Sequence, residues 1–95
     1  MTLADFQTSL KSDAPPPSLS PLLCALWHDH REDWDLAHQI AQEIETVHGA
    51  WVHAYLHRKE GDLSNARYWY RRANQPEATD SLESEWLRIV TALLN

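Results

Sequence analysis

An internal repeat is the feature of this chain that most constrains its fold. Two segments, which start at Leu22 and at Trp51 and so lie 29 residues apart, read LLCALWHDHREDWDLAHQIAQEI and WVHAYLHRKEGDLSNARYWYRRA. The identical aligned pairs are Ala25 and Ala54, His28 and His57, Asp33 and Asp62, and Ala37 and Ala66. A fixed offset of this size is typical of stacked helix-turn-helix units, which must share a core because neither buries its apolar face alone. We therefore expect two helical hairpins packed side by side.

Length and composition favour an all-α fold in one small domain. The chain has 95 residues and only two glycines, and its Val, Ile and Thr residues are scattered along the sequence. A sheet protein would need more turns and clustered β-branched residues. The five tryptophans partly offset the small core of so short a chain, because each can bury roughly 150–250 Å².

Helix start and stop signals divide the chain into an arm and a repeat domain. Residues 1–20 are predicted to form a short amphipathic helix and a linker with three consecutive prolines. Ser20 followed by Pro21 starts the repeat domain, which spans residues 21–95. Gly49 is placed to close the second helix, and Asp80 with Glu83 resembles a capping box. The predicted elements are a hairpin over 21–47, a hairpin over 50–75 and a capping helix over 81–94.

The segment Gly61–Ala73, GDLSNARYWYRRA, resembles the second half of a tetratricopeptide (TPR) repeat. The residues that match the pattern are Gly61, Leu63, Ala66, Tyr70 and Ala73, with Ala54 in the preceding helix. The first unit departs from the pattern, because Glu32 stands in place of the turn glycine and Ala41 in place of the aromatic residue. The string WVHAYLHRKEGD with NARYWYRRA also resembles small bacterial proteins of uncharacterised activity.

The TPR resemblance implies a protein that binds a peptide or partner helix on a concave face. The first helix of each pair builds that face in the family, so the resemblance points to a contact patch of Trp51, Tyr55, Arg58 and Lys59. Trp, Tyr and Arg are favoured at interaction hot spots. The alternative is that Trp51 and Tyr55 belong to the core of a small, tryptophan-rich protein.

The charges of the two units suggest how they interact. Residues 1–48 hold eight acids and two bases, whereas residues 49–95 hold six of each. Glu43 and Glu45 of the first unit are expected to pair with Arg71 and Arg72 of the second. This pairing can occur inside one molecule, or between molecules as self-association head to tail.

Histidines offer a competing function, the binding of a metal or a small molecule. His53 and His57 are four residues apart on one helix face, a spacing that lets two imidazoles share a metal ion. The third ligand could be His28, which is the repeat equivalent of His57, or Glu60. The alternative is that these histidines cap or hydrogen-bond the turns without a metal.

Several other classes are disfavoured. A net charge of −6 without a basic cluster argues against nucleic acid and against anionic membranes. A single cysteine, Cys24, and a first segment without the pattern of a signal peptide predict a cytoplasmic protein. No cofactor-binding loop or nucleophile–base pair is evident, so we expect neither a cofactor nor enzymatic activity.

Overall fold

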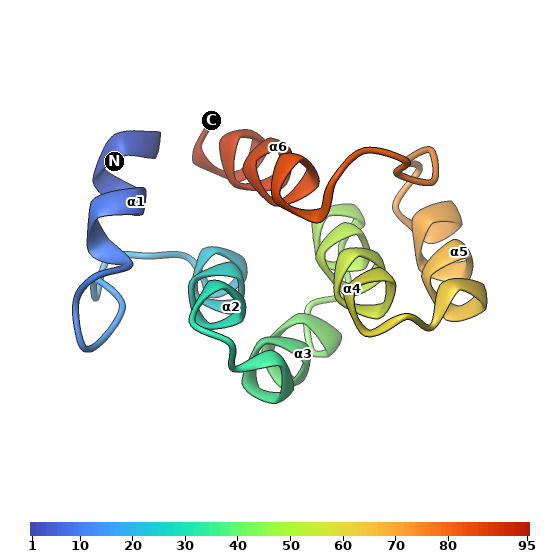
Figure 1. Cartoon of the computed structure of the whole chain (residues 1–95), viewed down its shortest axis with the longest axis horizontal. Coiled ribbons are helices and arrows are strands. Elements are labelled where there is room, and N and C mark those ends of the chain that lie inside the picture. Colours follow the sequence, from blue (N-terminus) through green and yellow to red (C-terminus); the bar gives the residue numbers. More distant parts are fainter.

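The computed structural model describes all residues from 1 to 95 and contains six helices and no strand (Figure 1). This confirms the prediction of an all-α protein. The helices are α1 Leu3–Ser9, α2 Pro21–His30, α3 Trp34–Gln42, α4 Val47–Glu60, α5 Leu63–Arg72 and α6 Leu82–Leu94.

Every helix begins after a residue whose side-chain oxygen accepts a hydrogen bond from an amide of the first turn. Such caps satisfy donors that have no partner inside the helix, which explains why the helices begin where they do. The six capping residues are Thr2, Ser20, Asp33, Thr46, Asp62 and Ser81. Ser20 with Pro21 starts α2 as predicted, and Thr2 forms a full capping box with Asp5.

The break between α3 and α4 lies earlier than predicted. Gly49 does not close the second helix but lies in the first turn of α4, where its amide donates to Thr46 Oγ1 at 3.0 Å. A Cβ atom at Gly49 would lie 2.0 Å from the carbonyl oxygen of Ile44. Glycine is therefore required here for close approach of the preceding loop, and Thr46 is the residue that starts the helix.

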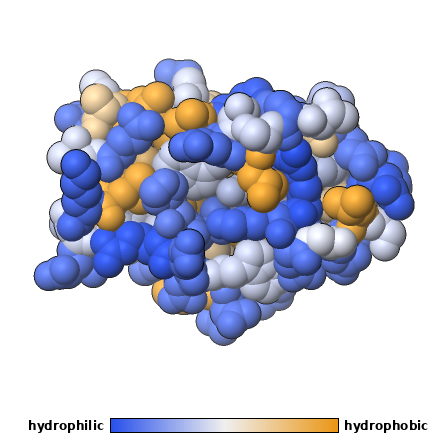
Figure 2. Space-filling view, viewed as in Figure 1, coloured by the Kyte–Doolittle hydropathy of each residue, from blue (hydrophilic) through white to orange (hydrophobic).

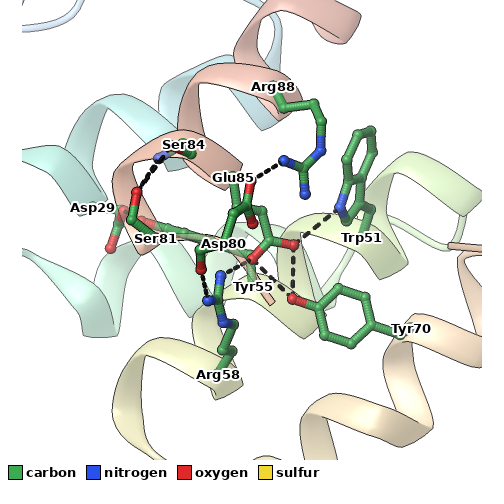
Figure 3. Close-up of polar contacts among 10 residues, drawn as sticks. All are labelled: Asp29, Trp51, Tyr55, Arg58, Tyr70, Asp80, Ser81, Ser84, Glu85 and Arg88. Atoms are coloured by element: carbon green, nitrogen blue, oxygen red, sulfur yellow. Dashed lines mark hydrogen bonds and ion pairs between the residues drawn. The ribbon is translucent and has the colours of Figure 1, made fainter. Parts of the chain in front are cut away.

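The start of α6 also differs from the prediction by one residue. Ser81 caps this helix and accepts from the amide of Ser84 at 3.0 Å, whereas Asp80 was predicted as the cap. The carboxylate of Asp80 instead pairs with Arg88, and its carbonyl oxygen accepts from Arg58 (Figure 3). The Asp80 side chain thus pairs with a later turn of the same helix, and its backbone is joined to α4.

Helices that follow one another pack together, α2 on α3, α3 on α4 and α4 on α5. The last helix crosses this row and contacts α2, α4 and α1 (Figure 1). Leu26, Leu56 and Ile89, which come from α2, α4 and α6, have no exposed surface. One core therefore lies beneath α6, while the division of the row into TPR-like hairpins stays a prediction.

The N-terminal arm packs on the body. Phe6 of α1 is fully buried, and its ring lies 5.8 Å from that of Trp86 in α6. Trp27 Nε1 donates to the carbonyl oxygen of Ser9 at 3.2 Å, and Arg31 donates to that of Leu10 at 2.9 Å. These contacts join the arm to α2 and to α6.

The surface seen in Figure 2 is mostly hydrophilic, with small, separated hydrophobic patches. None of the helices has the length and apolar character needed to cross a membrane.

Candidate functional site

The two aromatic residues of the predicted contact patch lie beneath α6. Trp51 and Tyr55 are only 6% and 3% exposed, so the core alternative describes their position. Trp51 Nε1 donates to Glu85 Oε2 at 3.3 Å, and the Tyr55 hydroxyl donates to Asp29 Oδ2 at 3.1 Å (Figure 3). Both aromatic side chains thus donate hydrogen bonds to carboxylates of their own chain.

The two cations of the patch are paired with those same carboxylates. Arg58 Nη1 lies 2.9 Å from Glu85 Oε1, and Lys59 Nζ lies 2.9 Å from Asp29 Oδ1. Glu85 and Asp29 are buried, so each cation neutralises a charge that would otherwise be costly to bury. The four patch residues therefore attach α6 and α2 to α4, and a pocket of about 260 Å³ remains beside Tyr55 and Lys59.

Two buried tyrosines complete this network. Burial, followed by the neighbouring carboxylates, raises the pKa of Tyr55 and of Tyr70. Both phenols therefore stay protonated at neutral pH and act as donors. The Tyr70 hydroxyl reaches both carboxylate oxygens of Glu85, at 2.8 and 2.7 Å.

A cluster of three histidines lies between α3 and α4. It consists of His38 from α3 and of His53 and His57 from α4, and one ring nitrogen of each lies within 4.8 Å of the others. The closest pair is His38 Nε2 and His53 Nε2, 3.0 Å apart. The predicted pair His53 and His57 is therefore present, with both residues buried.

His28, a predicted third member, does not join the cluster. Its ring lies edge-on to Trp27 at 5.1 Å. The repeat alignment pairs α2 with α4, whereas the helix that presents a histidine to His53 is α3. Sequence reasoning missed His38, although it stands four residues after Trp34 and so shares its helix face.

Aromatic contacts fix the orientation of these imidazoles. Trp34 stacks on His38, with ring centres 4.8 Å apart and planes at 9°. The His53 ring stacks on Trp69 at 4.0 Å and on His57 at 4.7 Å. The indole of Trp34 is held in turn, because its Nε1 donates to the carbonyl oxygen of Leu56 at 2.8 Å. The rings are thus ordered by packing before any ligand arrives.

The surroundings favour the neutral form of two members of the cluster, His38 and His53. Burial, together with the nearby His57 and His38, lowers the pKa of His53 to about 4. Burial and His57 also lower the pKa of His38. Neutral imidazole is the form that binds metal ions. On the outer side of the cluster, His57 Nδ1 lies 3.4 Å from Glu60 Oε1.

We expect acid to destabilise the protein through this cluster. Unfolded histidine binds its proton near pH 6.5, whereas folded His53 does so only near pH 4. The unfolded state therefore binds more protons in this window, and the free energy of unfolding falls as the pH is lowered. Solvent screening limits the contribution of His53 to the order of 1 kcal/mol. Urea denaturation at pH 7, 5.5 and 4.5 measures this slope.

Two variants separate this effect from general acid denaturation. His53→Gln is expected to flatten the pH slope, whereas the exposed His48→Gln is expected to keep it. Equal slopes in the wild type and in His53→Gln would show that the cluster does not cause the pH dependence.

The two groups of buried polar residues differ in what they can still bind. The carboxylates Glu85 and Asp29 are occupied by donors of their own chain. The histidine cluster instead brings together three ring nitrogens, two of which share a hydrogen bond that an ion can replace, and it is the candidate functional site. Comparison of the chain with protein-family models, with curated proteins and with solved structures found no match.

Proposed function

We propose that this protein binds a transition-metal ion, foremost Zn²⁺, through His38, His53 and His57. The observation that carries the proposal is the convergence of three ring nitrogens, all within 4.8 Å of one another, from two packed helices. Imidazole suits zinc, copper and nickel, and three protein ligands with one open position are typical of accessible zinc sites.

The spacing of the nitrogens fits such an ion. Tetrahedral zinc with Zn–N bonds of 2.0–2.1 Å separates its ligand nitrogens by about 3.3 Å. The His38–His53 distance of 3.0 Å is slightly shorter than this value, and the outer limit of 4.8 Å is longer. Small ring rotations are enough to bring the three nitrogens to the tetrahedral separation.

Glu60 supports the proposal from outside the ligand set. Histidines that bind metal commonly donate their second ring nitrogen to a carboxylate, which orients the ring and raises its basicity. The contact between His57 Nδ1 and Glu60 has this arrangement and leaves His57 Nε2 for the ion. Asp62 lies close to the same pair and adds negative charge.

The interaction-module hypothesis has weaker support. Its two aromatic residues are buried, and its two cations are paired with buried carboxylates. The TPR-like arrangement, α2 with α3 and α4 with α5, remains our proposal for the scaffold. In that arrangement the histidine cluster joins the second helix of one unit to the first helix of the next.

Titration of untagged protein with Zn²⁺ by calorimetry tests the metal site. We expect one ion per chain, and each of His38→Gln, His53→Gln and His57→Gln should weaken binding by about 100-fold, since three ligands leave little redundancy. Substitution by Co²⁺ should give the visible absorption bands of tetrahedral nitrogen coordination, which adventitious surface binding does not produce.

Two other histidines serve as matched controls. His28 is the ligand expected from the repeat, and His48 is exposed at the start of α4. His28→Gln and His48→Gln should bind zinc as the wild type does. Absence of binding at 100 μM Zn²⁺ (roughly −5.5 kcal/mol), or an equal loss in His28→Gln, would overturn the proposal.

A further inference from the structure

A cavity of about 320 Å³ lies beside the histidine cluster. It is enclosed by the end of α3, the loop over residues 43–46, the start of α4 and the end of α5. Its lining residues are Ala41, Gln42, Ile44, Glu45, Thr46, Val47, Gly49, Ala50, His53, Trp69 and Arg72. The volume is that of a small molecule rather than of a partner helix.

Two opposite charges face this cavity without neutralising each other. Arg72 and Glu45 both line it, yet neither forms an ion pair with any group of the chain. The predicted pairing of Glu43 and Glu45 with Arg71 and Arg72 is therefore not formed within one molecule. The Arg72 guanidinium lies over the Trp69 ring at 5.2 Å and donates to the Tyr68 hydroxyl at 2.8 Å. It is positioned by aromatic residues and keeps its charge available.

The rest of the lining is mixed, because Gln42 and Thr46 are polar while the other side chains are aliphatic or aromatic. The aliphatic side chains that face the cavity are those of Ala41, Ile44, Val47 and Ala50. His53, which is only 6% exposed, faces the cavity together with Trp69. The cavity thus combines one cation, one anion and an apolar wall.

We propose that this cavity binds a free α-amino acid with an apolar side chain, as its zwitterion. The carboxylate pairs with Arg72, the ammonium group with Glu45, and the side chain packs against Ile44 and Val47. A ligand with only a carboxylate would face Glu45, and one with only an amine would face Arg72, so each alone meets a like charge.

Calorimetry with L-leucine as the probe, in buffer with EDTA, tests the proposal without metal. Two analogues each remove one charge: 4-methylpentanoate lacks the ammonium group, and leucinamide lacks the carboxylate. We expect leucine to bind, and each analogue to bind at least about tenfold more weakly, because each loses one charge-assisted contact. This comparison uses wild-type protein and does not depend on any variant folding.

Substitutions test whether Arg72 and Glu45 bind the two charged groups of leucine. Arg72→Gln and Glu45→Gln should each weaken leucine binding about tenfold, while the neighbouring Arg71→Gln and Glu43→Gln should leave it unchanged. All four positions are exposed, and equal thermal midpoints would confirm that the variants fold. No leucine binding at 10 mM (roughly −2.7 kcal/mol), or binding of 4-methylpentanoate as strong as that of leucine, would overturn the proposal.

The amino-acid proposal goes beyond the metal site and can fail separately from it. His38 is a proposed metal ligand but does not line the cavity. His38→Gln should therefore lose zinc binding and keep leucine binding. Loss of leucine binding in this variant, at an unchanged thermal midpoint, would contradict the placement of the ligand in the cavity.

Discussion

Replacing Glu85 by alanine is expected to lower the free energy of unfolding by about 3–5 kcal/mol. Glu85 has no exposed surface and accepts hydrogen bonds from Trp51, Arg58 and Tyr70 (Figure 3). Removal of the carboxylate leaves a guanidinium without its charge partner and two buried donors without an acceptor. Urea denaturation followed by circular dichroism measures the change. A protein of this size has a total stability of about 5–14 kcal/mol, so the loss is a large part of it.

Glu83→Ala is the matched control, because Glu83 lies in the same first turn of α6 but is exposed. It should change the free energy of unfolding by no more than about 0.5 kcal/mol. Glu85→Gln keeps the shape and one acceptor, so its cost should fall between the two. A loss below about 1 kcal/mol in Glu85→Ala would mean that water or rearranged side chains satisfy the three donors.

Trp86→Ala is also expected to lower the free energy of unfolding, by about 3–5 kcal/mol. The indole is only 4% exposed and joins three helices. Its ring lies 5.8 Å from Phe6 of α1 and 5.0 Å from His30 of α2, and its Nε1 donates to the carbonyl oxygen of Leu26 at 3.1 Å. Truncation creates a cavity and leaves that carbonyl oxygen without its donor. The same denaturation experiment measures the loss.

Two substitutions separate burial from the removal of an aromatic ring. Tyr68→Ala removes an exposed ring and should cost no more than about 1 kcal/mol, including its contact with Arg72. Trp86→Phe keeps most of the packing but loses the hydrogen bond, so about 1–2 kcal/mol is expected. If Trp86→Ala were as mild as Tyr68→Ala, α1 and α6 would not be held by this side chain.

Both predictions concern how α6 is attached to the body. Its apolar face packs over α2 and α4, and Glu85 is the polar anchor within that face. Because α6 covers Trp51 and Tyr55, these two predicted contact residues stabilise the fold instead of facing a partner. The histidine cluster and the adjacent cavity lie elsewhere, where α3, α4 and α5 meet. The stabilising network and the proposed binding sites are therefore built from different residues.

Local signals predicted the secondary structure well because caps act over a few residues. Ser20 with Pro21 starts a helix where the sequence indicated. The errors at Gly49 and Asp80 arose where two residues close together could each act as a boundary. There the choice was made by contacts outside the local sequence, namely the approach of Ile44 and the pairing with Arg88.

The candidate site was only partly predictable for a related reason. The spacing of His53 and His57 follows from helix geometry and could be predicted from the sequence. The third histidine depended on which helix packs against α4, and the repeat alignment suggested His28 rather than His38.

The sequence by itself thus determined that the chain is helical, where most helices begin, and which two histidines share a face. Only the tertiary structure decided that His38 joins them, that α6 covers the two aromatic residues of the predicted patch, and that Glu45 and Arg72 face one cavity unpaired. Helix periodicity and capping are set by residues three to four positions apart. Packing between helices depends instead on the fit of whole surfaces, which no short segment encodes.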